Sequence, residues 1–349
     1  MGKVPIGHGA PIAIQSMTIT ETADVEATVQ QIRDLHVAGA DVVRVAVPHE
    51  KDARALVDVC REAPCPVIAD IHFDFRLAML SLEAGLGGLR LNPGNIGGEE
   101  RVKTVAHKAR DKGIPIRIGV NAGSLEKGLK EVLHGDLPQA MVVSASRHIG
   151  MLEAVDFHDI KVSLKSSDVR TTIEAYRLFA ERYDYPLHLG VTEAGTLVQG
   201  AVRSAAGLGT LLADGLGDTI RVSLAADPVQ EVVVAKHLLK AFGLRAGGMT
   251  LVACPSCGRA QVDVFAMAER VEKRLREVKA DITVAVMGCA VNGPGEARDA
   301  DVGLAGGNDA FLLFRKGEIV KKFPPADAEE RLVEEALKIA AELEAARTR

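Results

Sequence analysis

The sequence has no tryptophan, few aromatic residues and no long apolar run, and each absence removes a class of function. Aromatic residues make up 3% of the 349 residues, so stacking on aromatic side chains is not expected to dominate ligand binding. No apolar stretch approaches the roughly 18 residues that a membrane-spanning helix needs. The net charge is −5 and like charges do not occur in long runs, which argues against nucleic-acid and membrane-surface partners.

The start of the chain also lacks a basic segment followed by an apolar one, so we expect a cytoplasmic protein. The chain has five cysteines, an odd number that argues against a disulfide framework and for metal or redox use of some thiols. Cys60 and Cys65 lie in the first fifth of the chain, and we expect them to be buried, inert thiols. The last third holds Cys254, Cys257 and Cys289.

Short apolar, β-rich runs alternate with longer segments of helical period from about residue 11 to residue 224. Strands that alternate with helices predict parallel βαβ units. The eight runs cover residues 11–17, 41–47, 66–72, 87–92, 115–121, 160–165, 186–192 and 218–224. Eight units predict a closed (β/α)8 TIM barrel of the α/β class. The alternative is an open doubly wound sheet, which is disfavoured because the glycine-rich loop of a dinucleotide site is missing.

A glycine-rich linker at residues 243–248 ends this pattern. The residues after it predict a second, smaller α/β unit. Its predicted strands are 250–253, 281–287 and 302–305, its hairpin is 311–323, and its helices are 262–278 and a terminal one from residue 327. We therefore expect a TIM-barrel domain at residues 1–243 and a small α/β domain at residues 244–349.

Basic side chains recur near the ends of five predicted barrel strands. They are Arg44, Arg90, Arg117, Lys165 and Arg221. A cation in an apolar strand is costly unless it is paired, and active sites of such barrels lie at the C-terminal ends of the strands. The sequence offers mainly Asp70 and Glu193 as counter-charges on that face. The surplus of positive charge predicts a phosphorylated small-molecule ligand, and an internal salt-bridge network is the alternative.

Cys254 and Cys257 form a Cys-x2-Cys pair at the end of a predicted strand, and Cys289 closes the next strand. Zinc, iron–sulfur and redox dithiol sites all use such a pair. All ten histidines lie at or before His237, and no fourth cysteine follows, so the second domain cannot complete a usual zinc site from its own residues. Three thiolates therefore need a fourth ligand of another kind, or they leave an open position. Glu296, in a glycine- and proline-rich turn, is the local candidate, and the alternative is a solvated turn residue.

Taken together, the motifs are similar to those of the bacterial 4-hydroxy-3-methylbut-2-enyl diphosphate synthases, the penultimate enzymes of the non-mevalonate isoprenoid pathway. The most specific are Cys254-Pro-Ser-Cys-Gly-Arg259 and Met287-Gly-Cys-Ala-Val-Asn-Gly-Pro-Gly-Glu-Ala297. The barrel motifs are residues 11–18, 69–73, 90–95, 117–124, 163–165 and 190–195. The similarity covers nearly the whole chain, in the two-domain form that lacks the inserted middle domain of plant relatives.

The resemblance implies an iron–sulfur oxidoreductase that opens and dehydrates 2-C-methyl-D-erythritol 2,4-cyclodiphosphate with two electrons. It implies a homodimer that receives electrons from flavodoxin or ferredoxin. The implied ligands of a [4Fe–4S] cluster are Cys254, Cys257, Cys289 and Glu296, and Glu296 would also leave the iron during turnover. The implied substrate-binding residues are Arg44, Arg90, Asn92, Arg117, Asn121, Lys165, Arg221, Ser223 and Asn292.

Within the same resemblance, Glu193 would be a proton donor or a hydroxyl ligand, whereas Asp70 and His72 would be supporting groups. The rival function is a pteridine-binding-type barrel transferase with a structural zinc domain. Iron and zinc content would separate the two functions.

Overall fold

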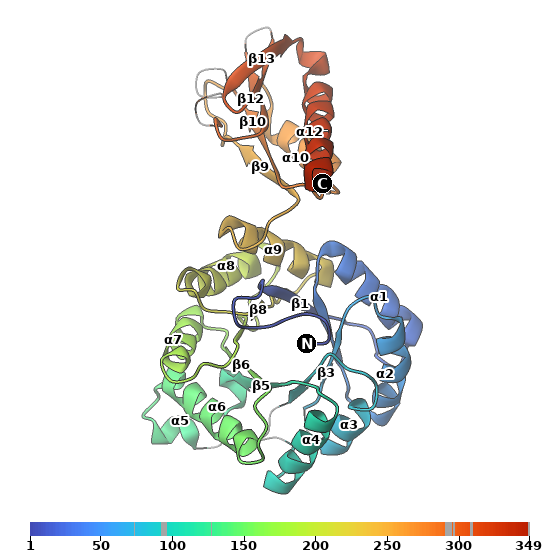
Figure 1. Cartoon of the computed structure of the whole chain (residues 1–349). Coiled ribbons are helices and arrows are strands. Elements are labelled where there is room, and N and C mark those ends of the chain that lie inside the picture. Colours follow the sequence, from blue (N-terminus) through green and yellow to red (C-terminus); the bar gives the residue numbers. More distant parts are fainter. Residues whose placement is uncertain are drawn as a thin grey trace. The chain divides into compact units, whose positions relative to one another are not determined.

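The computed structural model describes residues 1–349 except Phe73, Lys127, Glu296 and residues 92–95, 290–294, 308–309 and 348–349. The chain divides into two compact units, Met1–Arg245 and Ala246–Arg349, which Figure 1 draws from blue to red along the sequence. Among the described helices, none is both long and apolar enough to cross a membrane.

Eight parallel strands form the sheet of the first unit, at the positions where the sequence predicts strands. They are β1 (Ala13–Met17), β2 (Val42–Ala46), β3 (Val67–Asp70), β4 (Gly88–Leu91), β5 (Ile116–Asn121), β6 (Ile160–Lys165), β7 (His188–Leu189) and β8 (Thr219–Ile220). Their order in the sheet is β6-β5-β4-β3-β2-β1-β8-β7. A single parallel bridge between Val162 and Leu187 joins the two edge strands, so the sheet closes on itself. The TIM barrel expected from the sequence is confirmed.

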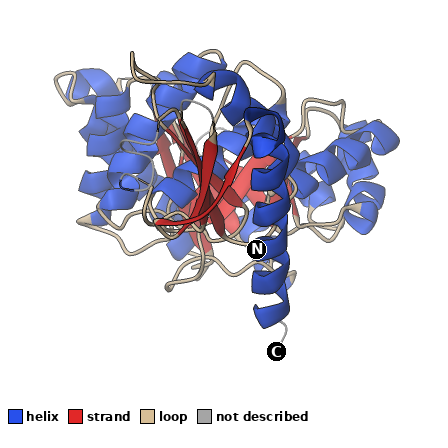
Figure 2. Ribbon diagram, turned by 90° about the horizontal axis from the view of Figure 1, so that it is seen from above, coloured by secondary structure: helices blue, strands red, loops and turns tan. Residues whose placement is uncertain are grey.

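Helices alternate with these strands and lie outside them (Figures 1 and 2). They are α1 (Val25–Ala38), α2 (Glu50–Glu62), α3 (Phe75–Ser81), α4 (Glu99–Asp111), α5 (Leu129–Val132), α6 (Leu137–Glu153), α7 (Val169–Ala180), α8 (Leu197–Ala213) and α9 (Pro228–Ala241), with a 3-10 turn at Ala122–Ser124. Aspartates cap several of them. The side chains of Asp24, Asp168 and Asp227 each accept a bond from a backbone N–H in the first turn, which fixes where α1, α7 and α9 begin.

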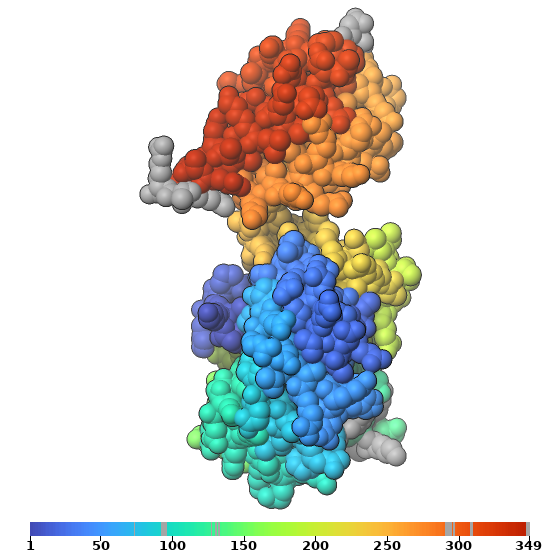
Figure 3. Space-filling model, turned by 90° about the vertical axis from the view of Figure 1, so that its right-hand side faces the viewer, coloured from blue at the N-terminus to red at the C-terminus, as the bar shows by residue number. Residues whose placement is uncertain are grey.

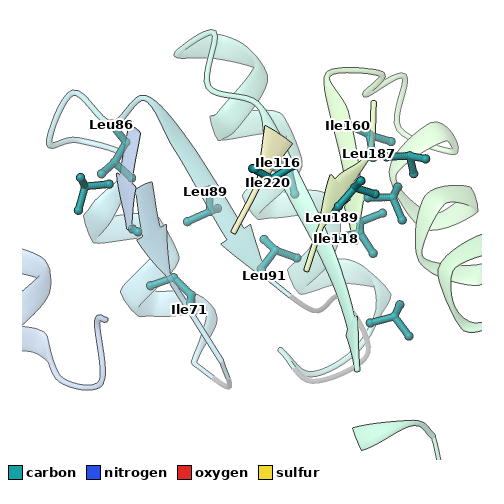
Figure 4. Packing of buried hydrophobic residues seen from close by; sticks show 14 of the residues in the cluster. Ile71, Leu86, Leu89, Leu91, Ile116, Ile118, Ile160, Leu187, Leu189 and Ile220 are labelled. Carbon is teal, nitrogen blue, oxygen red and sulfur yellow. The ribbon is translucent and has the colours of Figure 1, made fainter. Parts of the chain in front are cut away.

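The apolar core of this unit lies between the strands and the helices. Leu89 and Leu91 of β4, and Ile116 and Ile118 of β5, belong to it and are labelled in Figure 4. Since successive side chains of a strand point to opposite faces, the residues between them face the interior of the barrel. The barrel surface seen in Figure 3 is built largely from the first third of the chain, in blue and cyan.

In the described residues, the second unit is a mixed sheet with the helices α10 (Val264–Leu275) and α12 (Pro325–Arg347). Its strands are β9 (Met249–Ala253), β10 (Ile282–Met287), β11 (Val302–Gly306), β12 (Phe311–Arg315) and β13 (Glu318–Phe323). β9, β10 and β11 are parallel, β12 pairs antiparallel with β11, and β13 pairs antiparallel with β12. Val271 and Leu332, one from each helix, pack against this sheet in a core of its own.

Candidate active site

The structure brings together the five basic side chains that the sequence places near strand ends. They are Arg44, Arg90, Arg117, Lys165 and Arg221, here called the interior cation cluster. Each lies at an interior-facing position, either on a strand of its own or, for Arg221, directly after one. Arg90, Arg117 and Lys165 are buried, and the side chains of Arg44 and Arg221 are 11% and 16% exposed. The cluster therefore lies inside the barrel rather than on its helix-covered outer face.

Asp70 is the counter-charge at the β2–β4 side of the cluster. Arg44 Nε lies 3.5 Å from its Oδ2, and Arg90 Nη1 donates to its Oδ1 at 2.9 Å. Burial alone would raise the pKa of Asp70. Arg44, followed by His72 and Arg90, outweighs that effect and holds the pKa below its usual value. Asp70 is therefore a carboxylate at neutral pH.

The second counter-charge is Glu231 of α9, not Glu193 as the sequence suggested. Glu231 is buried and accepts from Arg221 Nη2 (3.3 Å), from the backbone N–H of Leu224 (3.0 Å) and from Ser16 Oγ (3.4 Å). Glu193 is exposed in the loop after β7, with φ at 53°. No ion pair between Glu193 and the cluster is described, so the sequence assigned the pairing partner of Arg221 wrongly.

Arg117 has more hydrogen-bond donors than it has described partners. Its Nη1 donates to Ser163 Oγ at 2.6 Å, whereas Nε and Nη2 have no partner among the described residues. Burial, followed by repulsion from Arg44 and Arg90, lowers the pKa of Arg117 well below its ordinary value. Burial likewise lowers the pKa of Arg44 to about 10. Unpaired N–H groups and unneutralised charge in a barrel interior are costly, and an anionic ligand would satisfy both.

Two glycines make room for the longest side chains of the cluster. A Cβ added at Gly119 would lie 2.7 Å from Arg90 Nε, and one added at Gly190 would meet Lys165 Nζ. Arg90 and Lys165 therefore pass directly over the backbone of neighbouring strands. Glycine at these positions is required by close approach.

The remaining predicted residues are placed less completely. Asn121 ends β5 and Ser223 lies three residues after the end of β8, and both are half-buried. His72 is half exposed above Asp70, with its Nε2 3.0 Å from Arg90 Nη1. Three predicted residues lie outside the described part of the chain. They are Asn92, Asn292 and Glu296.

The sequence search missed His188 and Lys161, which are both buried inside the barrel. His188 Nε2 lies 3.1 Å from Lys165 Nζ, and its Nδ1 lies 2.8 Å from Thr219 Oγ1. Lys161 Nζ contacts Met1 Sδ, and Lys161 lies two residues before Ser163 on β6. Strand alternation therefore already marked Lys161 as an interior residue. His188 lies five residues before Glu193, and no sequence signal marked it.

The barrel interior therefore holds more positive than negative charge. Six buried or half-buried cations are described there: Arg44, Arg90, Arg117, Lys161, Lys165 and Arg221. Their carboxylate partners are Asp70 and Glu231. TIM-barrel interiors are usually filled by branched apolar side chains. An excess of this kind is suited to binding a ligand with more than one negative charge.

In the second unit, the parallel pairing of β9 and β10 brings two cysteines to one edge of the sheet. Cys254 directly follows β9, Cys289 lies two residues after β10, and the backbone N–H of Gly288 donates to Cys254 Sγ at 3.1 Å. The loop that carries Cys257 returns to the same place, since Gln261 N donates to Gly288 O at 2.9 Å. Cys257 is exposed, and Cys254 and Cys289 are half-buried.

This edge gathers thiol side chains, a donor type that zinc, iron–sulfur and redox dithiol sites share. N–H donors to sulfur are one means by which proteins stabilise cysteine-ligated clusters. Among the described residues, no group of three or more His, Cys, Asp or Glu side chains is already assembled around a metal position. Glu296 lies outside the described residues.

The two cysteines of the barrel differ from these three. Cys65 is buried and Cys60 half-buried, and both pack against the apolar core. Burial raises the pKa of both thiols to about 12. They therefore stay protonated at neutral pH, as expected for inert core thiols.

Comparison with known proteins covers almost the entire chain. Residues 1–236 match the GcpE TIM-barrel domain, and residues 250–338 match the GcpE protein C-terminal domain. A 4-hydroxy-3-methylbut-2-en-1-yl diphosphate synthase (flavodoxin) of Geobacter sulfurreducens is 56% identical over 98% of this chain and 97% of that protein. The Bacillus subtilis protein of the same name is 54% identical over 97% of this chain and 89% of its own length.

Solved structures with a similar backbone are much more distant. A dihydropteroate synthase of Coxiella burnetii in complex with pteroic acid matches 68% of this chain and 93% of its own, at 12% identity and a TM-score of 0.47. Similarity of this degree has no bearing on function.

Proposed function

The chain belongs to the GcpE family, and we propose that its interior cation cluster holds the diphosphate group of a cyclic diphosphate substrate. The observation that carries this proposal is the excess of buried positive charge, together with the two unpaired donor atoms of Arg117. A ligand with two phosphoryl groups supplies both the negative charge and the acceptor oxygens that the interior lacks.

The reaction is the reductive ring opening of 2-C-methyl-D-erythritol 2,4-cyclodiphosphate to 4-hydroxy-3-methylbut-2-en-1-yl diphosphate. Two electrons and one proton enter, a ring carbon–oxygen bond breaks, and a hydroxyl group leaves with the proton as water. The diphosphate gains negative charge at the oxygen that the carbon releases. Preorganised cations beside that oxygen stabilise the charge as it develops, and mutagenesis elsewhere assigns about 3 kcal/mol to one such donor.

We propose these substrate-binding residues: Arg44, Arg90, Asn92, Arg117, Asn121, Lys165, Arg221, Ser223 and Asn292. The support is the interior position of six of them: Arg44, Arg90, Arg117, Lys165, Arg221 and half-buried Asn121. Glu193 is proposed as the proton donor. It lies just beyond the C-terminal end of β7, where barrel active sites form, and it has a positive φ that is uncommon outside glycine and clusters at functional sites.

We propose that Cys254, Cys257, Cys289 and Glu296 would hold a [4Fe–4S] cluster. The support is the shared edge of β9 and β10, the N–H donated to Cys254 Sγ, and the lack of any histidine beyond His237 for a zinc site. When bound, such a cluster supplies the electrons one at a time. Glu296, as an oxygen ligand among thiolates, would be the weakest of the four and the one that leaves during turnover.

Flavodoxin is the electron donor named for the curated relatives, and we propose flavodoxin or ferredoxin for this chain. We further propose a cytoplasmic homodimer. Light scattering on the anaerobically prepared protein measures the oligomeric state directly, and a monomer at assay concentration would remove that part of the proposal.

Iron and sulfide analysis of anaerobically reconstituted protein tests the cluster ligands. Cys289→Ser is expected to lose most of the iron and the visible absorbance, whereas Cys65→Ser, a matched change at a buried thiol of the barrel, keeps both. Glu296→Ala is expected to keep much of the iron but to lose turnover with reduced flavodoxin. Zinc in place of iron in active wild-type protein would instead favour the barrel transferase with a structural zinc domain.

A further inference from the structure

Lys165, like Arg117 with Ser163, is held by a neutral side chain rather than by a carboxylate. Its Nζ lies 3.1 Å from His188 Nε2, and this is the hydrogen bond that the structure describes for its ammonium group. In the described part of the chain, no carboxylate lies within ion-pairing distance of Lys165. By contrast, Arg44 and Arg90 share Asp70, and Arg221 pairs with Glu231.

His188 is itself fixed from two sides. Its Nδ1 lies 2.8 Å from Thr219 Oγ1 on β8, and the hydroxyl of Tyr176 on α7 donates to its backbone carbonyl. The side chains of Lys165, Tyr176, His188 and Thr219 are all buried. Burial, followed by repulsion from Arg117 and Arg44, lowers the pKa of Lys165 well below its ordinary value, and a bound anion opposes that shift. As an ammonium group Lys165 can only donate, so Nε2 then accepts from it and the ring proton lies on Nδ1, where it is donated to Thr219 Oγ1.

Its surroundings keep this imidazole neutral. Burial lowers the pKa of His188 well below the ordinary value, and repulsion by Lys165, Arg117, Lys161 and Arg44 adds to the effect. A protonated ring would have no acceptor to offer, and it would add another charge to an interior that already has an excess of cations.

We propose that His188 is a positioning residue for substrate binding, which orients the Lys165 ammonium toward the diphosphate while leaving its positive charge unneutralised. A carboxylate in the same place would orient Lys165 equally well, but it would cancel the charge that the ligand must meet. A neutral acceptor orients Lys165 without cancelling its charge. This inference rests on the proposed function, because it assumes that the interior binds a diphosphate.

The hydrogen bond also crosses the least-bonded seam of the barrel. Lys165 belongs to β6 and His188 to β7, the two strands that close the sheet through the Val162–Leu187 bridge. A purely structural role would be to hold this seam together. The test must therefore separate loss of folding from loss of anion binding.

Gln and Glu have nearly the same shape and differ in charge, which makes His188→Gln and His188→Glu the informative pair. Both can accept from Lys165. The Glu carboxylate also relieves repulsion among the cations, so His188→Glu is expected to melt at a higher temperature than His188→Gln. His188→Glu is nevertheless expected to bind inorganic pyrophosphate about tenfold more weakly than His188→Gln. The Glu carboxylate neutralises Lys165, so the ligand no longer gains a charged hydrogen bond from it.

The experiment measures pyrophosphate affinity by calorimetry, and the melting temperature, for both variants and wild type. In the cluster-loaded enzyme, His188→Gln is expected to raise KM for the cyclic diphosphate by less than about threefold and to leave kcat unchanged, because the amide oxygen still accepts from Lys165. Leu189→Val is the matched control on the same strand, since its side chain packs in the outer core.

The outcomes are distinguishable. If Glu and Gln variants bind pyrophosphate equally, or if affinity in all variants simply follows melting temperature, His188 only holds the seam and the inference is wrong. Lys165→Met serves as the separate arm for the proposed function. If Lys165→Met binds pyrophosphate as tightly as wild type, the diphosphate site itself is misplaced, whatever the His188 variants do.

Discussion

Gly119→Ala tests whether the position of Arg90 matters for the reaction. The added methyl carbon would lie 2.7 Å from Arg90 Nε and 3.0 Å from its Nη2, whereas ordinary van der Waals contact begins at 3.4 Å. The guanidinium group must therefore move by about 0.7 Å, the difference between 3.4 and 2.7. The backbone of Gly119 does not have a positive φ, so alanine meets no conformational penalty there.

That displacement is large enough to cost the hydrogen bond from Arg90 Nη1 to Asp70 Oδ1, which is 2.9 Å long. A hydrogen bond between charged groups contributes about 1.5–3 kcal/mol, which corresponds to roughly a 10- to 100-fold loss of kcat/KM if the same geometry holds the substrate. The gain of about 0.5–1 kcal/mol from replacing glycine in a strand offsets part of the stability loss. The melting temperature is therefore expected to fall by only a few degrees.

The assay is kcat/KM for the cyclic diphosphate in the anaerobic, cluster-loaded enzyme, with melting temperature measured in parallel. Gly150→Ala is the control, because Gly150 is exposed on α6 and a Cβ there meets nothing within 4 Å. It should gain up to about 1 kcal/mol of stability and keep full activity. Full activity in Gly119→Ala would refute the assignment of Arg90 to the substrate site.

Three further predictions concern charge. In Asp70→Asn the buried arginines lose their counter-charge, so the free energy of unfolding at pH 7 should fall by about 3–5 kcal/mol. Because the pKa of Asp70 is depressed in the folded state, its contribution to stability is present above the unfolded pKa of about 4 and is lost as pH falls below it. Urea unfolding from pH 7 to pH 3 should therefore show the difference in stability between wild type and Asp70→Asn shrinking. Lys161→Met should raise the free energy of unfolding at pH 7 by about 1 kcal/mol or more, because burial disfavours the charged lysine and lowers its pKa. This gain should fade as pH rises toward about 10, and a gain that does not change with pH in denaturant titrations would contradict the prediction. Inorganic pyrophosphate at about 100 times its Kd should stabilise wild type by about 2.7 kcal/mol in thermal unfolding, and no stabilisation would mean that the folded interior does not bind it.

Much of the fold followed from periodicity. All eight barrel strands fall within the runs identified in the sequence, since buried parallel strands leave short apolar segments between amphipathic helices. The closure of the barrel could not be derived in the same way. It depends on a single bridge between Val162 and Leu187, which are twenty-five positions apart and carry no local mark of pairing.

The site was predictable where charge interrupts an apolar strand, as at Arg90 and Arg117. It was not predictable where the partner comes from another element. Glu231 reaches Arg221 from the first turn of α9, and ordinary helix N-termini carry acidic residues too, so its role is visible only in three dimensions. His188 was overlooked because a histidine early in a strand resembles a core residue until Lys165 is seen beside it.

The measurement closest to the central claim is the affinity of anaerobic wild-type protein and Arg117→Met for 2-C-methyl-D-erythritol 2,4-cyclodiphosphate, determined by calorimetry. Arg117 has two donor atoms without partners among the described residues, so the account predicts that its removal weakens binding by about 10- to 100-fold while the variant remains folded. Equal affinity of the two proteins would contradict the claim that buried positive charge in the barrel binds the diphosphate.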